Sequence, residues 1–102
     1  MMELFDNDGY PTQEALLEVS RFDSVKDIDG YMNLIKSLWS YPDRFVLNDS
    51  ELYLSTGGWS GNESVIAAMK ENFFFFIAHT KWIRGGHFWF SLKGFKPTPR
   101  KG

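Results

Sequence analysis

The 102-residue chain contains no cysteine, which excludes disulfides, thiolate metal sites and cysteine nucleophiles. It also has no apolar run near the roughly 20 residues that a membrane-spanning helix needs, and its first residues lack the pattern of a secretory signal. Only two histidines are present, His79 and His87, and neither has a carboxylate or second histidine at metal-ligand spacing. We therefore expect a soluble, cytoplasmic protein with no metal and no cofactor.

Aromatic residues, by contrast, are in surplus. They make up 18% of the chain, more than a core of this size needs, so we expect some of them to be exposed for a partner. The length is that of a single domain that can bury a core without disulfides or a metal. We assign residues 1–94 to one domain and residues 95–102, with two prolines and three bases, to a flexible basic tail.

Charge is unevenly distributed along the chain. Residues 1–30 hold eight acids and two bases, whereas residues 80–102 hold six bases and no acid. Either the two ends lie close together and partly neutralise each other, or they form two separate surfaces that attract charged partners. Asp23, Asp27 and Asp29 are the acidic candidates for partner contact, although their position at a helix start is also typical of capping.

Two helices are predicted in the first half of the chain. Thr12 can cap the first, which should end near Phe22 because its apolar positions stop there. Ser24 followed three residues later by Asp27 resembles a capping pattern for the second, whose apolar residues recur at helical spacing. Tyr41-Pro42 stops this helix, since the residue before proline disfavours helical backbone.

Two β-hairpins and a third helix complete the predicted fold. Residues 44–48 and 51–55 are predicted to form the first hairpin, around the turn Asn48-Asp49-Ser50, and residues 73–83 and 87–92 the second, around Gly85-Gly86. The third helix lies between the hairpins and begins at Ser60. The order helix, helix, hairpin, helix, hairpin predicts an α+β domain with a four-stranded antiparallel sheet and helices packed on one face.

Residues 55–63, Ser-Thr-Gly-Gly-Trp-Ser-Gly-Asn-Glu, join a strand to the third helix. Gly57 and Gly58 tolerate positive φ angles and allow a tight turn, Trp59 anchors it, and Ser60 with Glu63 matches the capping box. The free N–H groups of such a turn can bind an anion. No lysine follows the glycines, however, and Glu63 adds a negative charge, so we favour a purely structural turn.

The register of the second hairpin decides which aromatic residues face the core. A two-residue loop at Gly85-Gly86 pairs Ile83 with Phe88 and Trp82 with Trp89. Alternate residues then share a face. The predicted core face carries Phe73, Phe75, Ile77, His79, Ile83, Phe88, Phe90 and Leu92. The predicted second face carries Phe74, Phe76, Ala78, Thr80, Trp82, Arg84, His87 and Trp89. We expect the second face to be covered by another layer or subunit rather than exposed as a binding surface; a one-residue shift would exchange the faces.

Residues 55–63, followed by a helix, an aromatic segment and the run Arg84-Gly85-Gly86-His87-Phe88-Trp89-Phe90, resemble a family of small bacteriophage and prophage proteins of unknown function. The resemblance covers roughly the second half of the chain. It implies a phage origin, a location in the cytoplasm of the bacterial host and an accessory role. It assigns no functional residue.

We expect no enzymatic activity, because no nucleophile is placed beside a base. The first hypothesis is a phage accessory protein that binds a host or phage protein, for example as an inhibitor of a defence complex such as a CRISPR effector. Aromatic residues are common anchors of protein interfaces. The candidate contact residues are Trp82, Arg84, His87 and Trp89, together with the three aspartates named above.

Two alternatives remain open. In the first, the chain binds single-stranded nucleic acid: Trp82 and Trp89 stack on bases, and the bases of the chain end contact phosphates. Those bases are Lys93, Lys96, Arg100 and Lys101. In the second, the chain is a structural phage protein that self-associates through the aromatic face of its sheet, as a homodimer.

Overall fold

The computed structural model describes residues 2–95, and its element order confirms the α+β prediction. The helices are α1 (Gln13–Arg21), α2 (Ile28–Leu38), α3 (Ser60–Met69) and α4 (Phe73–Ala78), and the strands are β1 (Phe45–Leu47), β2 (Glu51–Ser55), β3 (His79–Ile83) and β4 (His87–Ser91). Short 3-10 turns, η1 (Pro42–Arg44) and η2 (Lys93–Phe95), precede β1 and follow β4. Within residues 2–95, no helix is long and apolar enough to cross a lipid bilayer.

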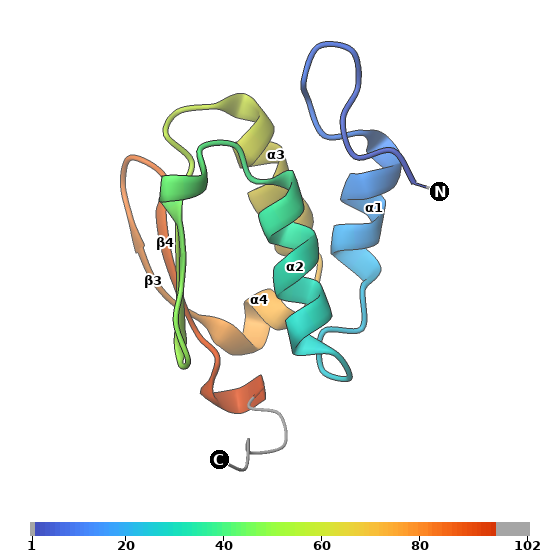
Figure 1. The fold of residues 1–102 in the computed structure, drawn as a ribbon. Helices are drawn as coiled ribbons and strands as arrows, with labels where there is room; N and C mark the ends of the chain where they lie inside the picture. Colours follow the sequence, from blue (N-terminus) through green and yellow to red (C-terminus); the bar gives the residue numbers. More distant parts are fainter. Residues whose placement is uncertain (1, 96–102) are drawn as a thin grey trace.

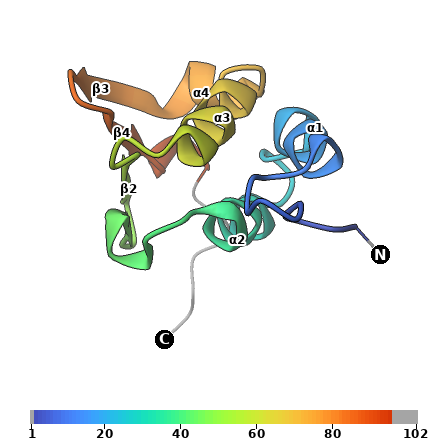
Figure 2. The ribbon, with the colours of Figure 1, turned by 90° about the horizontal axis from the view of Figure 1, so that it is seen from above.

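The four strands form one antiparallel sheet in the order β1-β2-β4-β3. The helices lie on one side of this sheet, as the two perpendicular views show (Figures 1 and 2). Leu52 of β2 pairs with Phe90 of β4, and Leu54 pairs with Phe88, so these four side chains share the face toward the helices. They are all buried, which places the core between sheet and helices.

The core combines residues from every helix with the inner face of the sheet. Burial of each large apolar side chain stabilises the fold by about 1.5 to 3 kcal/mol. The side chains with no exposed surface include Val19, Tyr31, Ile35, Leu52, Leu54, Val65, Met69, Phe74 and Phe90. Phe74 links the layers, because its ring contacts Tyr31 of α2, Phe90 of β4 and Phe95 of η2.

The prediction of a strand through residues 73–83 is wrong for its first half. Residues 73–78 form the helix α4, and only residues 79–83 are extended. The Asn72 side chain caps α4 by accepting a hydrogen bond from the Phe74 N–H at 2.8 Å. Helical spacing then buries Phe74 and Ala78, four residues apart, and leaves Phe76 82% exposed. The phenylalanine run therefore forms a helix, because the Asn72 cap and the burial of Phe74 and Ala78 outweigh its β propensity.

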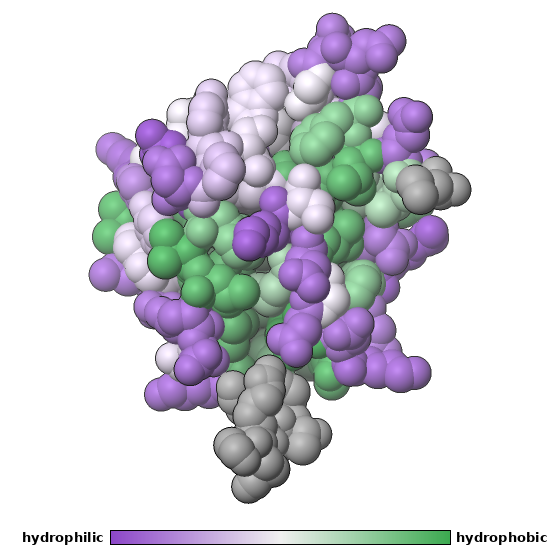
Figure 3. Space-filling model, in the orientation of Figure 1, coloured by the Kyte–Doolittle hydropathy of each residue, from purple (hydrophilic) through white to green (hydrophobic). Residues whose placement is uncertain are grey.

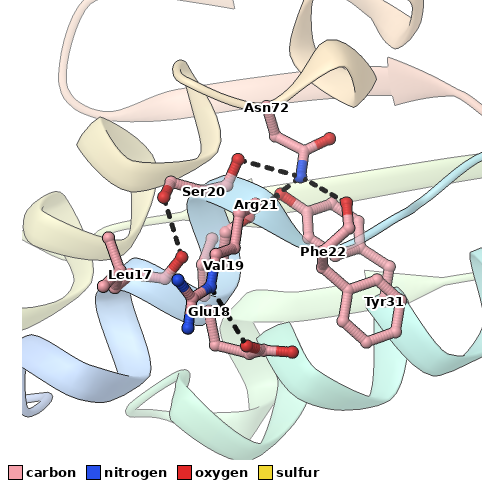
Figure 4. Close-up of polar contacts among 8 residues, drawn as sticks. All are labelled: Leu17, Glu18, Val19, Ser20, Arg21, Phe22, Tyr31 and Asn72. Atoms are coloured by element: carbon pink, nitrogen blue, oxygen red, sulfur yellow. Dashed lines mark hydrogen bonds and ion pairs between the residues drawn. The ribbon is translucent and has the colours of Figure 1, made fainter.

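Asn72 also ties the end of α1 to α4. Its side-chain amide donates to the carbonyls of Val19 at 3.0 Å and Phe22 at 2.9 Å, and its oxygen accepts from the Ser24 hydroxyl. Figure 4 shows the amide beside these carbonyls, with the Tyr31 hydroxyl donating to the Val19 carbonyl. A single buried side chain thus satisfies groups at the end of one helix and the start of another.

Two of the predicted capping pairs are wrong. Ser24 is buried against Asn72, and Asp27 alone caps α2 by accepting from the Gly30 N–H. The helix α3 begins at Ser60 as predicted, but no side chain caps it. The Ser60 hydroxyl donates instead to the Tyr10 hydroxyl, which leaves Glu63 without a capping role. By contrast, Thr12 caps α1 as expected, by accepting from the Ala15 N–H.

The predicted register of the second hairpin is also wrong. Ile83 pairs with His87 and Trp82 with Phe88, across a loop of three residues, Arg84-Gly85-Gly86. The shorter predicted loop placed each β3 residue opposite the wrong partner. A bulge between His79 and Lys81 then shifts the register again. Because Trp82 pairs with the buried Phe88, it lies on the helix side of the sheet, whereas Ile83, which pairs with His87, lies on the opposite side.

The chain end also departs in part from expectation. Phe95, which we assigned to the start of the tail, is buried in η2. Residues 96–102, the rest of the predicted tail, lie outside the described residues.

Candidate functional site

The turn within residues 55–63 and the β3–β4 loop, residues 84–86, meet at one end of the sheet. The Thr56 N–H donates to the Gly86 carbonyl at 3.0 Å, and the Thr56 side chain fills the space where a Cβ of Gly86 would lie. Gly57 and Gly58 have φ angles of +62° and +75°, as predicted for the tight turn. The turn before α3 and the loop between β3 and β4 are thus held against each other.

Most side chains of residues 55–63 stabilise the local fold. Trp59 packs on the Tyr10 ring with 4.7 Å between centroids. Asn62 is fully buried, accepts from the Ser40 N–H and donates to the carbonyls of Ser40 and Thr56. Glu63 is the exception, because it is exposed and the described residues provide no hydrogen bond or ion pair for its carboxylate.

Four side chains gather on the side of the sheet opposite the helices, and we call them the aromatic face: Tyr53, Lys81, His87 and Trp89. Tyr53 and Trp89 are paired across β2 and β4, with 4.9 Å between ring centroids. The Tyr53 hydroxyl is 2.8 Å from Nδ1 of His87. The Lys81 ammonium lies over the Trp89 ring, 4.8 Å from its centroid. The three rings are half-buried and form one connected cluster.

No described helix covers the aromatic face, which Figure 2 shows as the open side of the sheet. Apolar side chains border it, since Val46 pairs with Tyr53 and is 48% exposed, and Ile83 pairs with His87 and is 44% exposed. Figure 3 shows apolar surface over the β1–β2 hairpin, to which Val46 belongs. At one end Arg44 donates to the Ser55 hydroxyl at 3.2 Å. The result is an aromatic cluster with apolar side chains at its border and one basic side chain, Arg44, at one end.

The structure brings together only some of the predicted site residues. His87 and Trp89 share the aromatic face as expected. Trp82 is 59% exposed, but it lies on the opposite side of the sheet because of the register difference. Arg84 is exposed in the β3–β4 loop. The expectation that Trp82 and Trp89 act on one surface is therefore wrong.

The three predicted aspartates are distant from this face, near the link between α1 and α2 (Figure 1). Asp27 caps α2 and Asp23 accepts from the Lys26 N–H, while Asp29 is exposed in the first turn of α2. Bases lie among them: Arg21 and Lys26 line the same surface hollow as Asp23 and Asp27. The aspartates thus have local structural roles within a region of mixed charge.

The two histidines occupy different environments, and residues 2–95 contain no group of three or more His, Asp or Glu side chains that could hold a metal. His79 packs against Phe75 with 4.5 Å between ring centroids, and its Nε2 is buried without a hydrogen-bond partner. Burial lowers the pKa of His79 below its ordinary value of 6.5, and the positive charge of Lys70 acts in the same direction while a backbone hydrogen bond at Lys81 opposes it.

Our sequence reasoning missed Tyr53 and Lys81. Alternation in β2 places the Tyr53 side chain on the face away from Leu52 and Leu54, so its outward direction could be predicted. Its pairing with Trp89 could not, because it depends on the non-local contact of β2 with β4. Lys81 lies on the aromatic face because the three-residue loop pairs it with Trp89. Comparison with protein-family models, curated proteins and solved structures returns no match to this chain.

Proposed function

We propose that this protein is a binding module whose aromatic face contacts another protein. The observation that carries the proposal is the open sheet face, where Tyr53, His87 and Trp89 form a connected cluster without a covering layer. Tyrosine, tryptophan and arginine are the usual centres of binding energy in protein interfaces, and aliphatic neighbours help to exclude water around them. Tyr53 and Trp89 form such a centre, bordered by Val46, Ile83 and Arg44.

The arrangement of rings favours a protein partner over single-stranded nucleic acid. Base stacking needs open ring faces on one surface. Trp82 and Trp89, the two expected stacking residues, lie on opposite sides of the hairpin. Lys81 lies over the Trp89 ring, and the Tyr53 ring packs against it, so a base would have to displace one of them.

The resemblance of the two motifs to phage and prophage proteins suggests a narrower form of this proposal. In that form the partner is a host or phage protein, and the chain is an accessory factor that modulates it. A defence complex such as a CRISPR effector is one such partner. Self-association through the same aromatic face is the competing use of this surface.

The proposal can be tested with two tryptophan variants of the same hairpin. Trp89→Ala removes the centre of the aromatic face, whereas Trp82→Ala removes an exposed tryptophan from the opposite side. In affinity capture with purified candidate host and phage proteins, we expect Trp89→Ala to weaken binding at least tenfold, which corresponds to about 1.4 kcal/mol. Trp82→Ala should retain it.

Three outcomes would contradict the proposal. Equal loss in both variants would place the contact elsewhere. If the protein binds a single-stranded oligonucleotide in a salt-dependent way, and Trp89→Ala abolishes this binding, the nucleic-acid alternative is favoured. A dimer in solution that Trp89→Ala converts to a monomer would assign the aromatic face to self-association.

A further inference from the structure

A groove runs between α3 and the β3–β4 hairpin, on the helix side of the sheet. It consists of two adjoining hollows of about 270 and 310 Å³, which share Lys70, Trp82 and Phe88. Each hollow is near the lower end of the range for small-molecule sites, about 300 Å³. The exposed Trp82 forms one wall, and Ile66 and Ala67 of α3 contribute to the apolar lining of the first hollow.

Two side chains of opposite charge line this groove. Glu63 lines the first hollow beside Thr56 and Gly86, and Lys70 lies where the two hollows join. Both are exposed, and neither forms an ion pair within residues 2–95, where the Glu18–Arg21 contact is the only one. They are seven residues apart, with Glu63 in α3 and Lys70 as its C-cap, which corresponds to about 10 Å along the helix axis. The groove thus presents an acid, an apolar middle with an indole, and a base.

We propose that this groove binds an ω-amino carboxylate, with the ammonium group at Glu63, the carboxylate at Lys70 and the methylene chain along Trp82. In an extended lysine about 7 Å separate the ε-ammonium from the carboxylate, given C–C bonds of about 1.5 Å. Contacts of about 2.8 Å at each end extend this to a span that the two flexible side chains can match. Removal of the methylene chain from water against Trp82 adds to the two charge contacts.

Two other occupants fit less well. A phosphate would meet only one cation, Lys70, because the described lining of the groove contains no second lysine or arginine. A partner strand that extends the sheet would have to form regular backbone hydrogen bonds with the edge strand β3. The bulge at Thr80, whose hydroxyl donates to the Trp89 carbonyl, interrupts that edge. The opposite charges of Glu63 and Lys70 instead match a zwitterion.

This site is independent of the aromatic face, because the groove lies on the other side of the sheet. Free lysine and a C-terminal lysine of another chain share the proposed chemistry. The two sources differ at the α-amino group, which is charged in free lysine and acylated in a chain. Probes that differ at this group distinguish them.

The test is titration calorimetry of the full chain with 6-aminohexanoate. We expect saturable binding at millimolar concentrations, and at least fivefold weaker binding of hexanoate and of hexylamine, each of which lacks one charge. Lysine and Nα-acetyl-lysine then identify the source: preference for the first assigns free lysine, and preference for the second assigns a C-terminal lysine. A lysine amide, without the carboxylate, should bind at least fivefold more weakly than lysine.

Glu63→Gln and Lys70→Met remove one charge each at exposed positions, and each should weaken 6-aminohexanoate binding about fivefold. Glu14→Gln and Lys36→Met are matched controls at exposed positions outside the groove and should leave binding unchanged. In the doubly exchanged variant, Glu63→Lys with Lys70→Glu, binding should return because the ligand can reverse its direction.

NMR titration of His79 provides a local readout. Burial is the main cause of its lowered pKa and the positive charge of Lys70 adds to it, and a carboxylate bound at Lys70 offsets this second contribution. We expect this pKa to rise when 6-aminohexanoate binds. The proposal is wrong if no saturable binding occurs at millimolar concentrations, if hexanoate or hexylamine binds as well as 6-aminohexanoate, or if the groove variants behave like their controls.

Discussion

At the scale of single residues, the contact of Thr56 with Gly86 constrains the chain most closely. A Cβ at Gly86 would overlap the Thr56 side chain, and its φ angle of +85° is one that other residues rarely adopt. Gly58 has a similar φ angle of +75°, but no atom lies within 4 Å of the position a Cβ would take. A substitution at Gly58 therefore measures backbone strain alone, whereas one at Gly86 adds steric overlap with Thr56.

We expect Gly58→Ala to lower the free energy of unfolding by about 1 kcal/mol, the cost of left-handed backbone for a residue with a Cβ. Gly86→Ala should cost a further 1 to 3 kcal/mol, roughly, because the methyl group must displace Thr56. Urea unfolding of both variants measures the difference. Equal destabilisation would show that Thr56 moves aside freely.

His79 should make stability depend on pH. Its pKa is lower in the folded chain than its ordinary 6.5, so the unfolded chain binds more protons as the pH falls. Stability should therefore be constant above about pH 7.5 and decrease as the pH falls through 6.5 toward the lower folded pKa. Thermal unfolding at pH 7.5 and 5.5 checks this. The same decrease in His79→Phe would assign it to other groups.

At the scale of secondary-structure elements, Asn72 links α1 to α4. Asn72→Ala removes the donors to the Val19 and Phe22 carbonyls and the acceptor of the Phe74 N–H in one change. We expect a loss of about 3 kcal/mol in the free energy of unfolding, because buried polar groups remain unpaired.

Tyr31→Phe is the matched comparison for Asn72→Ala. It removes only the hydroxyl that donates to the Val19 carbonyl, and that carbonyl keeps its bond from Asn72. Its cost should be about 1 kcal/mol. Chemical denaturation of both variants compares them, and a larger loss in Tyr31→Phe would contradict the central role of Asn72.

The elements that the sequence predicted correctly are those with local signals. Thr12 caps α1, the turn at Gly57 and Gly58 has positive φ angles, and the β1–β2 hairpin forms where expected. The residues 73–78 were predicted wrongly because their aromatic composition favours a strand, whereas the Asn72 cap and contacts with distant residues favour a helix. Tertiary packing decides such short apolar runs.

The candidate site was predictable only in part for a related reason. The alternation in β4 placed His87 and Trp89 together on the outward side. The length of the β3–β4 loop determines the side on which Trp82 lies, and sequence periodicity does not show this length, so Trp82 was placed on the wrong side. Glu63 was assigned to capping because the spacing from Ser60 fits, but the Ser60 hydroxyl bonds to Tyr10 across the fold.

At the scale of the whole molecule, charge has a small part in holding the described fold together. Residues 2–95 contain one ion pair, between Glu18 and Arg21, with 3.8 Å between Nε and Oε1 and both side chains well exposed. The acids near the start of the chain and the bases of the β3–β4 hairpin are therefore not paired in this part of the protein. Packing and hydrogen bonds carry its stability.

We accordingly expect stability to change little between low salt and 1 M sodium chloride, since screening an exposed pair of this kind costs at most about 0.5 kcal/mol. Thermal unfolding in both solutions measures the effect. Arg21→Ala should likewise be nearly neutral. A large decrease in melting temperature at high salt would indicate stabilising electrostatic contacts between the two oppositely charged regions.

The placement of Trp82 and Trp89 on opposite sides of one hairpin also gives the protein two separate optical reporters. Trp39 is buried and Trp59 packs on Tyr10, so changes in emission on ligand addition should come mainly from the other two indoles. Trp82 is the more exposed and should be quenched by acrylamide until the groove is filled, whereas Trp89 responds to the aromatic face. Single Trp→Phe variants would let occupancy of each surface be followed by fluorescence in the same protein.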